Sequence, residues 1–142
     1  MKNKFKGVLF SILFGLVGTI PWIIISHFGW VVSLAGYLIG LAAYTGYVKG
    51  NGSFDRVGKI CLVIVILITI PFAELVNIFI AGLLEGLNFI QVALVLPYFI
   101  RWDIDHIAQN ILLGYFMAAL GTYRFFIPRR NKIPVEPIQN IN

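Results

Sequence analysis

Residues Gly7 to Val48 read GVLFSILFGLVGTIPWIIISHFGWVVSLAGYLIGLAAYTGYV and contain no Asp, Glu, Lys or Arg. At about 1.5 Å per residue, one helix of this length would be about twice as long as the 30 Å hydrocarbon core of a bilayer. The sequence therefore predicts a helical hairpin with helices over about 7–26 and 30–48. We expect the break at the polar cluster from Ser26 to Gly29, with Trp22 and Trp30 in an interfacial aromatic belt on either side.

The composition of the whole chain is that of a membrane protein. Of its 142 residues, 59% are hydrophobic and only 12% are charged, whereas soluble domains average about 25% charged residues. Four spans of roughly 20 residues with their loops account for this length, so we expect one domain. The single cysteine, Cys61, excludes an internal disulfide and a Cys-x-x-Cys pair for metal or redox chemistry.

Two further spans are expected after the polar loop that follows the hairpin. They cover about residues 60–84 and 107–127, and residues 128–142 form a cytoplasmic tail beyond a four-helix transmembrane domain of residues 1–127. The apolar segment 89–100 is short for a span and contains Pro97. The expected fold is an all-α membrane protein of two hairpins, with this segment interfacial or re-entrant on the outer side before the last helix.

The distribution of basic residues predicts the orientation. With four spans, ten of the eleven Lys and Arg residues fall on one side, which the positive-inside rule makes the cytoplasmic side. Only Arg101 falls outside. A fifth span would move the four cations after Tyr123 to the outside. The chain is therefore predicted to be a multi-pass protein of the inner (plasma) membrane with both termini cytoplasmic, and its net charge of +5 reflects topology rather than nucleic-acid binding.

Small residues mark faces for close helix packing. Gly36 and Gly40 form a Gly-x-x-x-Gly pattern in the second predicted helix, and Gly114 and Gly121 mark a similar face in the fourth. Such residues let helix backbones approach closely in lipid. We favour packing inside the bundle over homodimerisation.

A short motif recurs along the chain. Thr-Ile-Pro-Trp at positions 19–22 is followed fifty residues later by Thr-Ile-Pro-Phe at 69–72. Two parallel hairpins related by a pseudo-twofold axis would explain the match. Coincidence in apolar sequence of low diversity explains it equally well, and both interpretations stay open.

Glu74 is the only acidic residue inside a predicted span. A central acidic side chain costs about 2.5 to 3.5 kcal/mol on insertion scales, so it is expected to face the bundle interior or a wet cavity. Asn77 shares its helix face. In one interpretation a neutral Glu74 is hydrogen-bonded to Asn77 or to a hydroxyl on a neighbouring helix. In the other, Glu74 with Asn77 binds a cation or a proton in a transport site bordered by kinks at Pro21 and Pro71.

Asp103, Asp105 and His106 form an outer polar cluster before the last helix. Carboxylates and an imidazole can bind a divalent cation, but an aspartate at this position also caps a helix N-terminus. Capping is the favoured interpretation, and no metal site is predicted. The sequence has no nucleophile elbow, zinc-protease motif, P-loop or dinucleotide-binding glycine motif, so we expect neither catalysis nor a cofactor.

One resemblance to known proteins covers most of the chain. It is carried by Gly15, Gly18, Pro21, Trp22, Phe28, Gly29, Trp30, Gly36, Gly40, Ala42, Gly46, Tyr47, Gly114, Tyr115 and Gly121. This pattern resembles a group of small bacterial membrane proteins of unassigned function, some of which carry a zinc ribbon before the first helix. The zinc-ribbon cysteines are missing here, and the resemblance implies a topology without an activity.

The predicted function is that of a non-enzymatic membrane protein. It would act through helix–helix or partner contacts in the bilayer, in an accessory, envelope or immunity-type role. Its expected contacts are the lipid bilayer and a membrane protein partner or further copies of itself, without nucleic acid. A small transporter or channel subunit using Glu74 is the alternative, and an outer-face membrane enzyme using Asp103, Asp105 and His106 is the least favoured.

Overall fold

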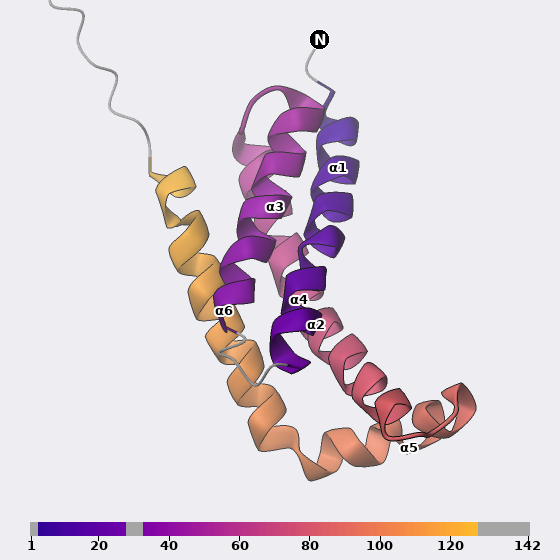
Figure 1. Cartoon of the computed structure of the whole chain (residues 1–142). Helices are drawn as coiled ribbons and strands as arrows, with labels where there is room; N and C mark the ends of the chain where they lie inside the picture. Colours follow the sequence, from indigo (N-terminus) through magenta and orange to yellow (C-terminus); the bar gives the residue numbers. More distant parts are fainter. Residues whose placement is uncertain (1–2, 28–32, 128–142) are drawn as a thin grey trace, which may run out of the picture.

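The computed structural model describes residues 3–27 and 33–127, and over these residues the chain is helical with no β-strand, as predicted. The helices are α1 (Lys4–Val17), α2 (Thr19–His27), α3 (Ser33–Asn51), α4 (Arg56–Leu84), α5 (Phe89–Trp102) and α6 (Ile104–Phe126). Figure 1 shows α1, α3, α4 and α6 running along the long axis of the molecule, whereas α5 crosses one end. Two expectations, the outer side of the first hairpin around Trp30 and the tail 128–142, lie outside the described residues.

The first predicted helix is divided in two. Only Gly18 separates α1 from α2, and Pro21 follows in the first turn of α2. Proline has no N–H to bond the carbonyl four residues earlier, and its ring crowds that carbonyl. The hydroxyl of Thr19 donates a hydrogen bond to the Leu16 carbonyl at 2.7 Å and so satisfies a backbone acceptor at the break.

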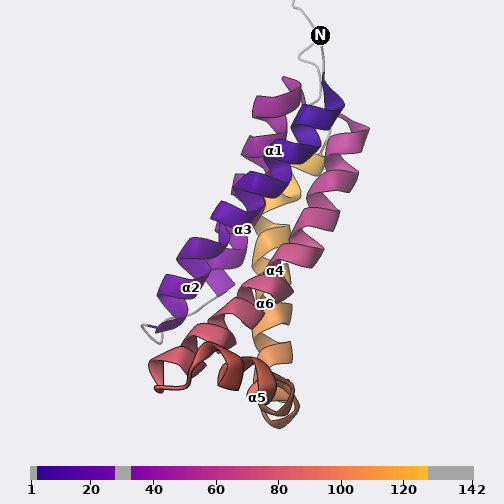
Figure 2. The ribbon, with the colours of Figure 1, turned by 90° about the vertical axis from the view of Figure 1, so that its right-hand side faces the viewer.

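Glycines bring α1 and α3 into backbone contact. A Cβ added to Gly46 would overlap the Phe10 carbonyl, and one added to Gly50 would overlap the Lys6 carbonyl. The Ser11 hydroxyl also donates to a carbonyl of α3 at 2.9 Å. The helices α1 and α3 are therefore closely packed, and Figures 1 and 2 both show them as neighbours.

The helix α4 continues through Pro71, where a side chain of α6 supplies the missing donor. Pro71 leaves the Leu67 carbonyl without its usual intrahelical partner. The hydroxyl of Tyr115 on α6 donates to that carbonyl at 2.8 Å. The expected kink position is thus also a contact between helices.

Both ends of α4 have recognisable capping motifs. Asp55 accepts a hydrogen bond from the Gly58 N–H at 2.9 Å, so the helix begins at Arg56 and not near residue 60 as predicted. At the other end Gly86 has φ +91°, and the N–H groups of Gly86 and Leu87 bond back to the last turn. These bonds form a Schellman motif, which reverses the chain toward α5.

The segment predicted to be interfacial or re-entrant is the helix α5. Asn88 and Gln91 form a capping box at its start. Figure 2 shows α5 across the end of the bundle where α4 ends and α6 begins. Val92 is buried against Gly82 of α4, while Ile90, Leu94 and most other apolar side chains of α5 are exposed.

The two hairpins of the possible repeat pack differently. Along α1 and α3 the backbones touch at several glycines, whereas α4 makes far fewer contacts with α6. The two hairpins meet where Gly36 of α3 contacts Gly114 of α6. They therefore differ in how closely their own helices pack.

Candidate functional site

Glu74 is held inside the bundle by side chains from two other helices. It lies on α4 and is only 3% exposed. Its Oε2 accepts a hydrogen bond from Trp22 Nε1 of α2 at 3.0 Å, and its Oε1 accepts one from Asn110 Nδ2 of α6 at 2.9 Å. We call these three residues the Glu74 clamp. The clamp joins α2, α4 and α6 in the half of the bundle nearer α5.

Glycines make room for the indole ring of the clamp. Trp22 is fully buried, and a Cβ added to Gly114 would come within 2.6 Å of its ring. Gly114 in turn meets Gly36, whose added Cβ would overlap the Gly114 carbonyl. Without small residues at both positions, α6 could not approach α3 while leaving space for Trp22 beside Glu74.

The predicted packing glycines all lie between α3 and α6. In addition to the pair just described, an added Cβ on Gly40 would come within 2.7 Å of Thr122, and one on Gly121 within 2.5 Å of the Tyr37 ring. These four glycines, Gly36, Gly40, Gly114 and Gly121, are covered by contacts within one chain. They therefore leave no small-residue face along this interface for a second copy.

The clamp differs from the sequence prediction in its partners. The prediction named Asn77 or a hydroxyl as the partner of Glu74, and the structure adds Trp22 and Asn110, two nitrogen donors on other helices. Trp22 was expected in an interfacial belt, and it is instead buried. The sequence could have identified Trp22 as a partner of Glu74. A buried indole needs an acceptor for its N–H, and Glu74 is the one acidic side chain in the predicted spans. Nothing in the spacing identified Asn110.

The clamp contains a titratable group with neutral partners. Trp22 and Asn110 offer N–H donors, and no Lys, Arg or His forms an ion pair with Glu74 among the residues that the structure describes. An ionised carboxylate is an acceptor only, which suits two donors. Neither donor nitrogen can ligate a metal, and the described part of the chain contains no group of three His, Cys, Asp or Glu side chains placed to hold one.

The outer polar cluster is exposed and contains one hydrogen bond between side chains. Asp103 Oδ1 lies 2.9 Å from His106 Nδ1, with both side chains largely open to solvent. Asp103 occupies the N-cap position of α6, but its side chain makes no capping hydrogen bond, which differs from the capping prediction. Its carboxylate bonds the imidazole instead. Asp105 lies in the first turn of α6, where a negative charge favours the helix dipole.

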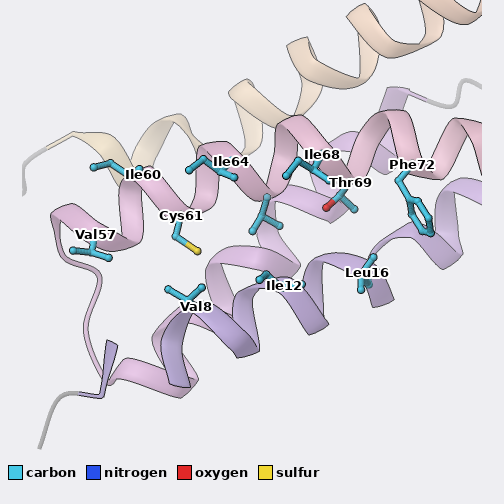
Figure 3. A pocket seen from close by; sticks show the side chains of 11 residues that line it. Val8, Ile12, Leu16, Val57, Ile60, Cys61, Ile64, Ile68, Thr69 and Phe72 are labelled. Atoms are coloured by element: carbon cyan, nitrogen blue, oxygen red, sulfur yellow. The ribbon is translucent and has the colours of Figure 1, made fainter. Parts of the chain in front are cut away.

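An apolar groove runs between α1 and α4. It encloses about 430 Å³ and is lined on one side by Val8, Ile12 and Leu16, and on the other by residues of α4 from Val57 to Phe72. Figure 3 shows these side chains facing one another, with Cys61 and Thr69 as the polar exceptions. A second apolar cavity of about 480 Å³ lies between α4 and α6.

The opposite end of the bundle has a smaller polar site at Asp55. Besides capping α4, this carboxylate accepts a hydrogen bond from the Tyr47 hydroxyl at 2.7 Å. Tyr47 is fully buried. The site therefore joins the end of α3 to the start of α4 across the loop between them.

Acid should remove part of the stability through Asp55. The Gly58 N–H and then the Tyr47 hydroxyl hold the pKa of Asp55 below its ordinary value of 3.8. A carboxyl with a lowered folded pKa stabilises the fold fully above its unfolded pKa, and that contribution is lost as pH falls through the folded pKa. We expect the protein in detergent to lose stability below about pH 4, and Asp55→Asn to lose less over the same range. Thermal unfolding from about pH 6 to about pH 2 measures this, and equal acid slopes in the two proteins would contradict it.

No protein-family model, curated protein sequence or solved structure matches the chain. The resemblance to small bacterial membrane proteins therefore stays a prediction from the sequence. The Glu74 clamp and the α1–α4 groove are the features from which a function can be argued.

Proposed function

We propose that the chain is a four-span integral membrane protein that acts through contacts within the bilayer. Two helical stretches, Lys4–Ile25 and Arg56–Leu84, are long and apolar enough to cross a membrane. Only 28% of the apolar window of each is buried, whereas a core helix of a soluble protein is mostly buried. Exposed Leu, Ile, Val and Phe side chains along α1 and α4 fit contact with lipid.

The charges support one orientation for this arrangement. Six of the seven described Lys and Arg residues lie near the end of the bundle opposite α5, where α1 and α4 begin and α3 and α6 end. They are Lys4, Lys6, Lys49, Arg56, Lys59 and Arg124. Lys59 Nζ donates to the Phe126 carbonyl at 3.3 Å, which joins the start of α4 to the end of α6. Arg101 and three of the described acidic residues lie at the other end. We therefore assign the basic end to the cytoplasm.

In this arrangement α5 lies along the outer surface of the membrane. Its 14 residues are too few for a span. Most of its apolar side chains are exposed at the end of the bundle, including Trp102 at 91%. An apolar helix with a terminal Trp and Arg suits the boundary between hydrocarbon and headgroups.

Reporter fusions test the topology. We expect fusions after Gly52 and after Lys132 to report the cytoplasm, and a fusion after Gly86 to report the outside. An outside signal at Lys132 would mean five spans and would contradict the arrangement.

The observation that carries a contact role is the α1–α4 groove. The glycine faces are already used inside the chain, whereas this groove is open and apolar. Its α4 side, from Val57 to Phe72, extends about 22 Å, which exceeds the roughly 15 Å depth of one leaflet. An acyl chain from one leaflet would leave part of it empty, so the groove fits a transmembrane helix of a partner protein better.

Photo-crosslinking tests the contact role. A crosslinking side chain at Ile64 lies in the groove, and one at Ile24 on α2 is a matched control, since both isoleucines are about half exposed. We expect a protein adduct from Ile64 that is missing from Ile24. An adduct of twice the chain mass would identify a second copy as the partner. Adducts with lipid alone would contradict the contact role.

The Glu74 clamp favours a second candidate function, that of a small transporter or channel subunit. A buried acidic side chain without a cationic partner is a common ion- or proton-binding group in membrane proteins. Gln keeps the size and hydrogen-bonding groups of Glu but cannot ionise. If ion flux by the parent protein in vesicles persisted unchanged in Glu74→Gln, this candidate would be dropped.

A further inference from the structure

We infer that the Glu74 clamp is a proton-binding site, in which a proton binds Oε1 of Glu74 and the Asn110 side-chain amide turns to accept it. The inference deepens the second candidate function by naming the ligand. It rests on the geometry of three side chains. It can hold even if the protein moves no ions.

The two carboxylate oxygens differ in what their partners can do. Trp22 Nε1 is a donor only, so Oε2 is an acceptor in every protonation state that keeps this bond. Asn110 carries both an NH₂ donor and a carbonyl acceptor on one amide. A half-turn about its last side-chain bond exchanges the two. The acidic proton can therefore be accommodated at Oε1 alone.

The binding step conserves the number of hydrogen bonds between the three side chains. In the ionised state Oε1 accepts from Asn110 Nδ2, at 2.9 Å, and Oε2 accepts from Trp22. When a proton from water binds Oε1, the new O–H donates to Asn110 Oδ1 after the amide turns. Oε2 then serves as the carbonyl oxygen that still accepts from Trp22. One proton is taken up, and two hydrogen bonds link the three side chains in both states, while the Asn110 NH₂ gives up its bond to Oε1.

The surroundings indicate the route and favour a proton over a metal ion. The bond to Trp22 is buried, whereas the bond to Asn110 is only partly buried, so a proton can approach Oε1 from the Asn110 side. Asn110 lies about 9 Å from the start of α6, which places this access at the α5 end. A metal ion would have to displace both N–H donors and would find no cluster of further ligands among the described residues.

Other titratable groups on the surrounding helices are separate from the clamp. On α6 they include Asp105 and His106, which are exposed at its start, and Tyr115, whose hydroxyl bonds Leu67. On α4 the next acidic residue is Glu85, which is exposed beyond the helix end. On α2 there is no titratable side chain from Thr19 to Ile25, and on α3 Tyr37 packs on Gly121.

Trp22 gives a direct readout, because a charge beside the indole N–H shifts its fluorescence. The test uses the full chain in detergent with Trp30→Phe and Trp102→Phe, which leaves Trp22 as the single tryptophan. We expect its emission to change in one step between an acid and an alkaline pH limit at which the protein stays folded. Glu74→Gln in this background should abolish the step. His106→Gln, the matched control outside the clamp, should leave it unchanged.

Several outcomes would overturn the inference. These are a flat response in the single-tryptophan protein, a step that persists in Glu74→Gln, or a step that disappears in His106→Gln. A midpoint that moves when sodium or calcium replaces choline in the buffer would identify a competing cation at the site. Asn110→Leu should move the midpoint, since it removes the group that accepts the proton, and an unmoved midpoint would exclude the amide from the mechanism.

A second measurement covers the case in which Glu74→Gln fails to fold. Combining Glu85→Gln, Asp103→Asn, Asp105→Asn and Glu136→Gln leaves Asp55 and Glu74 as the acidic side chains. Infrared difference spectra between the two pH limits should still show the carbonyl stretch of a protonated carboxyl group, and this stretch should persist when Asp55→Asn is added. Its loss in these variants would assign the titration to the other acids and reject the clamp.

Discussion

Gly36→Leu should destabilise the folded protein by about 3 kcal/mol or more. Even a single Cβ at Gly36 would overlap the Gly114 carbonyl, which belongs to backbone and cannot turn aside as a side chain can. Relief requires α3 and α6 to separate, which would also draw Gly114 away from the Trp22 ring. Unfolding of the purified protein in mixed micelles, followed by its helical circular dichroism, measures the loss.

The control for this change is Ala119→Leu. Ala119 lies on α6 next to the buried Ala118, but its own side chain is exposed. The same added bulk there should change the free energy of unfolding by less than about 0.5 kcal/mol. Equal losses in the two variants would show that α3 and α6 do not pack through Gly36.

Trp22→Phe should cost about 2 to 3 kcal/mol. Phe retains an aromatic ring but removes the N–H that bonds Glu74 Oε2. Interhelical hydrogen bonds in membranes are often worth only about 0.6 kcal/mol. The larger value is expected here because Glu74 is only 3% exposed. When the Trp22 donor is lost, its Oε2 cannot form a replacement hydrogen bond with water.

A double-mutant cycle separates the hydrogen bond from the change in ring size. In a Glu74→Leu background no acceptor remains, so Trp22→Phe should cost less than about 1 kcal/mol. The difference between the two backgrounds is the coupling between Trp22 and Glu74. A coupling near zero would mean that the indole contributes through packing alone.

The helical segments could be predicted because local patterns determine them. The uncharged run from Gly7 to Val48, the loop at Gly52 and the short segment with Pro97 each have a signature in adjacent residues. The errors in the boundaries also have local causes. Asp55 caps α4 earlier than the apolar pattern suggested, and Pro21 divides the first helix close to Gly18.

The partners in the clamp could not be predicted in the same way. In the sequence, Trp22 lies 52 residues before Glu74, and Asn110 lies 36 residues after it. Whether they meet depends on how far each helix is rotated and shifted against the others. That placement is set by close contacts such as Gly36 on Gly114, whose register the one-dimensional pattern of small residues does not contain. The sequence indicated an interior acid without indicating what would bind it.

The length of α4 has a mechanical consequence in a bilayer. In the four-span arrangement that we propose, its 29 residues extend about 43 Å and exceed a 30 Å hydrocarbon core, and a tilt of the helix reduces this hydrophobic mismatch. α5 is joined to its end by the turn at Gly86 and anchored to it by Val92 on Gly82. In a thicker membrane α4 stands more upright and carries α5 outward, while in a thinner one it leans further and draws α5 in. A change in membrane thickness therefore changes the tilt angle of α4, and the tilt angle sets the position of α5 relative to the membrane surface.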